Sequence, residues 1–172
     1  AVNQHAILSL PTAQVHELHA PMYLADGIGL TGPIPRYCDF EDTGGPFFLD
    51  AQKTTADLIE DDQALWFETR GGLVIVLGCC HSGIVNTVDY IRQVSGIAKV
   101  RGIVGGLHLL NASSLRMEGT VHALRALKVD FLIPCHCTGE DAVAQLRQGL
   151  GADVVRPACA GMTFCLGGMR DA

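Results

Sequence analysis

Three histidines, each placed after an apolar run, are the residues of this sequence best suited to joint chemistry. His81, His108 and His136 each follow a short stretch rich in Leu, Val and Ile that is typical of a buried strand. In open α/β sheets, ligands bind beyond the carboxyl ends of the strands, where several loops converge. A lone histidine at a strand end is more often a hydrogen-bonded structural residue, but imidazole is also the commonest protein ligand for metals. Three such histidines therefore predict a metal or catalytic site.

Cys79 is a fourth candidate ligand. It lies two positions before His81, and the alternation of an extended chain points such a pair toward one side. Its thiolate could bind a metal, and the alternative is a small buried thiol that fills space between sheet and helix. The seven cysteines are odd in number and lack zinc-ribbon or thioredoxin spacing, so we expect reduced thiols rather than a zinc site built on cysteines alone. Asp61 and Asp62 are either carboxylates that orient ligands or a solvated turn.

The chain from residue 72 onward alternates strands and helices, and these elements must position the candidates. We expect strands over residues 73–77, 100–104 and 131–133, helices over residues 83–96, 114–128 and 139–149, and short final strands at 154–155 and 162–166. Ser82 and Thr138 are expected to cap the first and third helices. The first 70 residues predict loops and edge strands, with a hairpin that joins residues 64–69 to 73–77. These features indicate one α/β domain over residues 1–172 with a mixed sheet.

Composition and missing motifs exclude several functional classes. The chain has 172 residues, 48% of them hydrophobic, and a formal charge of −6 without a cluster of Lys and Arg, which argues against nucleic acid as a partner. Its apolar runs are far shorter than the roughly 20 residues of a membrane helix. The N-terminal residues do not resemble a secretory signal, so we expect a cytoplasmic protein. The simplest serine hydrolase, nucleotidase and dinucleotide-binding motifs are absent, which leaves metal chemistry on a small-molecule substrate.

Several motifs together resemble one family. The chain is similar to the metallo-β-lactamase superfamily, in the branch of the archaeal dihydropterin ribofuranosylaminobenzene phosphate synthases, in the segments Thr31-Gly-Pro-Ile-Pro-Arg36, Asp61-Asp-Gln-Ala-Leu65, residues 73–88, Gly105-Gly-Leu-His-Leu-Leu110 and Pro134-Cys-His-Cys-Thr-Gly139. The resemblance implies an αββα sandwich with one or two metals in a cleft along one edge. The family's main metal motif, H-x-H-x-D-H, is absent from this sequence. The resemblance therefore predicts the C-terminal half of the sandwich, with a mixed sheet and helices on one face.

The same resemblance assigns roles to individual residues. It implies that His81 and His136 are metal ligands, to which the residues themselves add Cys79 as a candidate. It also implies that His108 forms part of the cleft wall or contacts the substrate, and that Arg36 contacts the substrate. Zinc is the expected metal, with iron or manganese as alternatives. Two or three ligands hold such an ion weakly, so we expect low occupancy in this chain.

The leading functional prediction is a metal-dependent hydrolase that is incomplete in this chain, with a pterin or a phosphoester as substrate of the complete protein. The alternative is a catalytically inert binding or assembly module derived from that fold. A thiol redox protein is a third reading, which the apolar surroundings of the cysteines disfavour. Half a sandwich leaves a sheet face open. We therefore expect a homo-oligomer or a missing N-terminal half to cover it.

Overall fold

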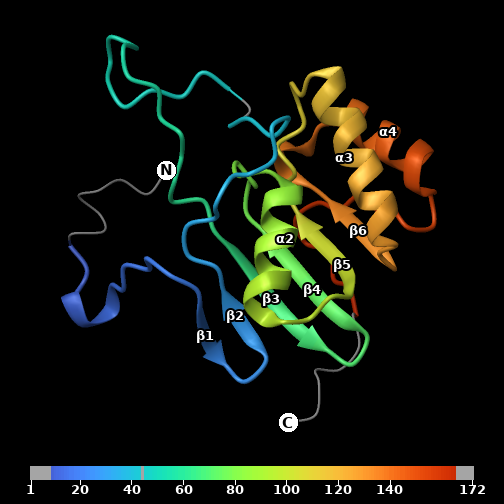
Figure 1. Cartoon of the computed structure of the whole chain (residues 1–172), viewed down its shortest axis with the longest axis horizontal. Coiled ribbons are helices and arrows are strands. Elements are labelled where there is room, and N and C mark those ends of the chain that lie inside the picture. Colours follow the sequence, from blue (N-terminus) through green and yellow to red (C-terminus); the bar gives the residue numbers. More distant parts are fainter. Residues whose placement is uncertain (1–8, 44, 166–172) are drawn as a thin grey trace.

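The computed structural model describes residues 9–43 and 45–165, which form a mixed sheet with three helices on one face (Figure 1). The strands lie side by side in sequence order, and they are β1 (Met22–Ala25), β2 (Ile28–Leu30), β3 (Ala64–Thr69), β4 (Gly72–Leu77), β5 (Val100–Gly105) and β6 (Phe131–Pro134). The pairs from β1 to β4 are antiparallel, whereas β4, β5 and β6 run parallel. The predicted mixed sheet and the hairpin of β3 with β4 are confirmed.

The helices lie close to their predicted positions. They are α2 (Ile84–Ser95), α3 (Ser114–Leu127) and α4 (Glu140–Leu150), with 3-10 turns η1 (Thr12–Gln14) and η2 (His136–Thr138). In α2, Ile84, Val88 and Ile91 recur at spacings of three and four and are all buried, so they face the sheet. Gly96 adopts a left-handed conformation and ends that helix. None of the described helices is long and apolar enough to span a membrane.

The main core lies between the sheet and the helices. Its members are at most 8% exposed and include Leu73 and Ile75 from β4, Ile103 from β5, Leu132 from β6, and Ile84, Ile91, Leu124 and Leu146 from the helices. Burial of each such side chain contributes about 1.5–3 kcal/mol. Trp66 of β3 is also buried, and a Cβ at Gly29 would lie 2.0 Å from its ring, so only glycine fits beside it. This packing makes the three parallel strands a rigid base for the loops that follow them.

The opposite face of the sheet has a smaller core. Val74, Phe131 and Ile133 are buried there, and no described helix contributes to this cluster, which confirms that the helices lie on one face. The face is less open than half a sandwich would be, because Ala158 packs on it and its N–H donates to the carbonyl of Pro134 at 3.0 Å. The segment after α4 therefore covers part of this face. The need for a partner stays a prediction.

Some predicted details are wrong. Of the strand expected at 154–155, only a single bridge between Val155 and Leu132 forms, and residues 162–165 form no strand, while residue 166 lies outside the described residues. The N-cap residues of α2 and α4 are Gly83 and Gly139, and neither Ser82 nor Thr138 caps a helix. Local spacing suggested these caps, but both side chains are buried, and the Thr138 hydroxyl donates to the Cys135 carbonyl and accepts from the Leu107 N–H instead.

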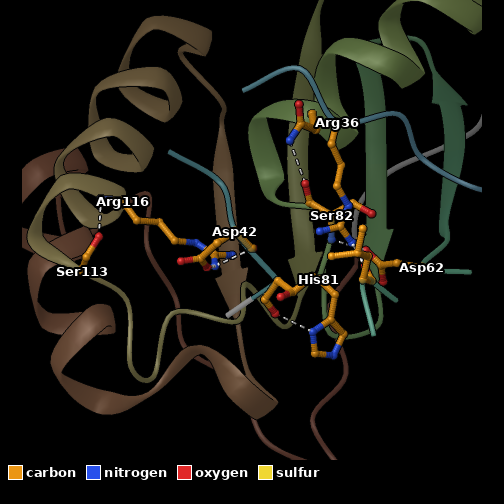
Figure 2. Close-up of polar contacts among 10 residues, drawn as sticks. Arg36, Asp42, Asp62, His81, Ser82, Ser113 and Arg116 are labelled. Atoms are coloured by element: carbon orange, nitrogen blue, oxygen red, sulfur yellow. Dashed lines mark hydrogen bonds and ion pairs between the residues drawn. The ribbon is translucent and has the colours of Figure 1, made fainter. Parts of the chain in front are cut away.

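The long connection between β2 and β3, residues 31–63, is irregular, as predicted for this part of the chain. A single bridge joins Phe48 to Ala56, and the carboxylate of Asp50 accepts hydrogen bonds from the N–H groups of Thr54 and Thr55. Part of this connection runs past α2 and α3 and approaches the ends of the parallel strands (Figures 1 and 2).

Candidate metal and substrate site

The candidate residues gather beyond the carboxyl ends of β4, β5 and β6. Backbone hydrogen bonds tie the three loops to one another. The N–H of Gly106 donates to the carbonyl oxygen of Gly78 at 3.0 Å, and the N–H of Cys135 donates to that of Gly105 at 3.1 Å. The N–H of Leu110 donates to the carbonyl oxygen of Cys137 at 3.3 Å. The loops therefore lie side by side. Since the strands beneath them are fixed by the core, the positions of the side chains in these loops are fixed as well.

The three loops share a strained backbone conformation. Cys80, His108 and His136 have φ of +61°, +48° and +53°, in the left-handed region that residues with a Cβ seldom adopt. Each such residue costs on the order of 1–3 kcal/mol and persists only where the surroundings impose it. One such residue therefore lies in each of the three adjacent loops, and Lys53, Ile59 and Lys128 adopt the same conformation elsewhere.

Cys79, His136 and Cys137 form one group of possible metal donors. The Sγ of Cys79 lies 3.1 Å from Nε2 of His136, and the donor atoms of all three residues lie within 4.8 Å of one another. Cys137 Sγ donates to the carbonyl oxygen of Cys79 at 3.4 Å. A Cβ at Gly106 would lie 2.8 Å from Cys137 Sγ, so glycine makes room for the thiol. Two sulfurs and one imidazole nitrogen are donors that zinc prefers, so the residues fit this metal.

Burial keeps one of these thiols protonated in the absence of a cation. Burial, with a smaller contribution from the neighbouring Cys79, raises the pKa of Cys137 to about 11. Metals bind thiolates rather than thiols, so binding at this group releases protons.

His81 and His108 form a second cluster next to the loops. Their ring centroids lie 4.1 Å apart, and Phe47 lies edge-on to His81 at 5.1 Å and tilted to His108 at 6.0 Å. Both histidines are half-buried. Within the described residues, His81 is not part of the donor group of Cys79, His136 and Cys137. The roles of His81 as a ligand and of His108 as a substrate contact stay predictions.

The tautomer of neutral His81 follows from its hydrogen bond. Its Nδ1 lies 3.0 Å from the carbonyl oxygen of Thr43. A carbonyl oxygen only accepts, so Nδ1 carries the proton and Nε2 keeps a free lone pair. Next to it, the N–H of Ser82 donates to the carboxylate of Asp62 at 2.7 Å (Figure 2). Asp62 therefore orients the loop that carries His81, whereas Asp61 is exposed.

Within the described residues, the hydrogen bonds of Arg36 are to main-chain carbonyls and not to His81 or His108. Its Nη2 donates to the carbonyl oxygens of Leu58 and Ile59, at 2.6 and 3.2 Å. This arginine therefore ties two parts of the long connection together. Its role as a substrate contact stays a prediction.

A hollow of about 350 Å³ lies beside His136. Its lining comes from β6, η2, the start of α4 and the segment after α4, and includes Pro134, Cys135, Thr138, Glu140, Val143 and Pro157. This volume lies in the range of small-molecule sites. The hollow and the donor group share His136, so a small molecule in the hollow would lie next to the donors.

Comparison with known proteins supports the family. No protein-family model matches the chain. The chain is 38% identical over 123 residues to a 7,8-dihydropterin-6-methyl-4-(β-D-ribofuranosyl)-aminobenzene-5′-phosphate synthase of Methanocaldococcus jannaschii. The matched residues are 69% of this chain and 42% of that protein. An uncharacterized protein of the same organism is 29% identical over 140 residues, which are 81% of this chain and 51% of that protein. The chain thus spans about half the length of the curated relatives it matches.

A solved structure agrees with these relatives. The crystal structure of a metal-dependent hydrolase of the β-lactamase superfamily matches with a TM-score of 0.74 and 32% identity, over 84% of this chain and 56% of that one. The fold of this chain is that of the metallo-β-lactamase superfamily. The predicted family and fold class are confirmed, and the partial coverage of a superfamily member fits the predicted half of a sandwich.

Sequence reasoning missed three parts of the candidate site. It did not place Cys137 with Cys79 and His136, although Cys137 directly follows a predicted ligand. It also missed Thr43, which holds His81, and Glu41, whose carboxylate accepts from the N–H groups at the start of α2. For Thr43 and Glu41 the sequence holds no signal, because their partners lie about 40 residues away.

Proposed function

We propose that this chain forms the C-terminal part of the active site of a metal-dependent hydrolase of the metallo-β-lactamase type. The observation that carries the proposal is the donor group at the strand ends, where Cys79 Sγ and His136 Nε2 lie 3.1 Å apart with Cys137 beside them. Cys79 and His136 would hold a zinc ion, with iron or manganese as alternatives. His81 would join them through its Nε2 lone pair. A bound metal lowers the pKa of its water toward about 7 and polarises the substrate.

The proposed substrate is a small molecule with a planar ring system and a phosphate ester. The name of the synthase relative, which contains both a dihydropterin and a phosphate, supports this class. The rings of Phe47, His81 and His108 offer an aromatic edge against which a planar heterocycle could pack. His108 would orient the substrate there, and Arg36 would supply a positive charge from the segment that precedes this edge.

Zinc sites use three or four protein donors, and Cys79 and His136 with His81 reach only the lower number, so further ligands would complete the site. We propose that they come from the part of the fold that the longer relatives have beyond this chain, or from a second copy of it. The chain covers 42% and 51% of the two curated relatives, which supports this division.

A cobalt titration tests the proposal. Cobalt(II) binds zinc sites, and thiolate ligands give it an intense charge-transfer absorption. We expect this absorption in the 172-residue chain, a large decrease in its intensity in Cys79→Ser because Cys137 is then the one thiol left in the donor group, and weaker binding in His136→Ala. Cys159→Ser is the matched control, because Cys159 is exposed and lies outside the donor group. Absorption of wild-type intensity in Cys79→Ser would contradict the proposed ligand. The absence of any cobalt binding would favour the inert module.

A further inference from the structure

The segment of residues 37–43, called the orienting segment below, joins helix α3 to His81. We propose that Arg116 of α3 is a positioning residue: it fixes the end of the orienting segment, whose Thr43 carbonyl holds the Nδ1 proton of His81. Nε2 is then the nitrogen that His81 presents to a metal or substrate. What His81 does with this nitrogen rests on the proposed function, but the tautomer itself does not.

The first step is the contact between Thr43 and His81. The Nδ1 to carbonyl distance is 3.0 Å, and the carbonyl belongs to the main chain. Because the acceptor is a main-chain atom, the position of the backbone at Thr43 decides whether the bond to Nδ1 forms. Partners of this kind fix the ring orientation of histidine ligands in metal sites.

The second step is the contact between Arg116 and Asp42. Nη1 of Arg116 donates to both the carbonyl oxygen of Asp42, at 2.9 Å, and its carboxylate (Figure 2). One guanidinium nitrogen thus grips the main chain and the side chain of the residue directly before Thr43. The Asp42 side chain is 71% exposed, whereas that of Arg116 is 1% exposed. The arginine therefore reaches from the core to the orienting segment.

The burial of Arg116 is not explained by its own hydrogen bonds. Its Nε and Nη2 are buried and have no hydrogen-bond partner among the described residues. A buried charge with unpaired donors is costly, so this arginine adds little to stability. The placing of Asp42 and Thr43 is a role that accounts for the burial of Arg116.

The third step is that the rest of the orienting segment has anchors of its own. The Oδ1 of Asn86 accepts from the N–H groups of Tyr37 and Cys38, at 2.8 and 2.9 Å. The Glu41 carboxylate accepts from two N–H groups of α2, and the ring of Phe40 lies against Gly119 of α3. Loss of Arg116 removes a charge that acts on Glu41, but the hydrogen bonds that anchor residues 37–41 remain, so Asp42 and Thr43 should be freed most.

Nitrogen NMR of the imidazole rings tests this inference. The 172-residue chain is labelled with ¹⁵N-histidine, freed of metal with a chelator and measured at pH 8, where a histidine of ordinary pKa is neutral. His81 is assigned from the spectrum of His81→Ala. We expect the Nδ1–H tautomer to predominate in the wild type, with a small Nε2–H population. In Arg116→Met, the Nε2–H form should rise about fivefold, as for the loss of one ordinary hydrogen bond.

Two variants separate positioning from a general effect on the fold. Arg116→Lys keeps the charge and a donor, and should restore most of the Nδ1–H form. Arg125→Met is the matched control on the same helix, because the Arg125 guanidinium donates to Gly149 instead of to the orienting segment. It should leave His81 unchanged. An equal effect in Arg116→Met and Arg125→Met would overturn the inference, as would an unchanged tautomer in Arg116→Met.

A variant at the surface covers the case in which Arg116→Met does not fold. Asp42→Ala removes the carboxylate from the exposed end of the pair and should also raise the Nε2–H form, though less, because the carbonyl contact remains. A wild-type tautomer in Asp42→Ala, when Arg116→Met does not fold, would overturn the inference. The measurement uses metal-free protein, so a chain that binds no metal would contradict the proposed function without affecting this test.

Discussion

The parallel part of the sheet and the long connection between β2 and β3 contribute different things to the candidate site. The loops after β4, β5 and β6 supply the groups suited to coordination or substrate contact, among them Cys79, His108 and His136. The connection of residues 31–63 supplies groups that orient them, such as Thr43 and Asp62. Loops anchored directly on the strands thus carry the candidate ligands, and an irregular segment orients them.

This difference has a physical basis. Strand ends are fixed by the core, so they place several side chains at one edge at little extra cost. The irregular connection has little core of its own and is held by polar contacts to α2 and α3 instead. Changes in the sheet should therefore cost stability, while changes in the connection should mainly alter the site.

The largest expected effect concerns the stability of the two regions. Leu132 of β6 is fully buried, whereas Leu49 of the connection is 69% exposed. Leu132→Ala should lower the free energy of unfolding by about 2–5 kcal/mol, because it leaves a cavity in the core. Leu49→Ala should change it by less than about 0.5 kcal/mol. Urea unfolding measures both, and similar losses in the two variants would erase the distinction between the regions.

An intermediate effect is expected where the two regions meet. Gly83 has φ of +88°, and a Cβ there would lie 2.2 Å from the carboxyl carbon of Glu41. Gly83→Ala should cost about 2–3 kcal/mol, from backbone strain and the displaced carboxylate. Gly78→Ala is the control, because a Cβ at Gly78 meets nothing within 4 Å. Equal unfolding midpoints for the two variants would show that Glu41 does not need its close approach to α2.

The smallest effect is a dependence of stability on pH that comes from Glu41. Burial raises the pKa of its carboxyl group, and this outweighs the N–H groups of Asn86 and Val85 and the charge of Arg116, which lower the pKa. The folded state then holds the proton to a higher pH than the unfolded chain does. Stability from this group is full below the ordinary pKa and falls as pH rises through the raised one.

Glu41→Gln cannot titrate at this position. Between about pH 4 and pH 7, a range that starts near the ordinary pKa of glutamate, the wild type should therefore lose more unfolding free energy than the variant does. Urea unfolding at several pH values measures the difference. A wild type that gains stability over the variant as pH rises would mean that the helix N–H groups outweigh burial.

The strands and helices from residue 72 onward could be predicted because their sequence signals are local. The continuous apolar run of residues 73–77 indicates a strand covered on both faces, and Ile84, Val88 and Ile91 repeat at helical spacing. The placement of His81, His108 and His136 beyond strand ends follows from those elements alone. This part of the site was therefore visible in the sequence.

The contacts that refine the site could not be predicted in this way. Ser82 looked like the cap of α2, but the Glu41 carboxylate binds the first N–H groups of that helix from about 45 residues away. Arg116 and Asp42 are 74 residues apart. In the sequence, such acidic residues resemble a solvated loop, and only the folded chain shows which of them are buried against helix ends.

The most direct test of the central claim is metal content after equilibrium dialysis against zinc, measured by inductively coupled plasma mass spectrometry on untagged protein. Dialysis detects an ion that is held weakly. We predict about one zinc per chain, a large loss in His136→Ala, and no change in His122→Ala, since His122 is exposed on α3. Equal zinc contents in His136→Ala and the wild type would contradict a metal site at the ends of the parallel strands.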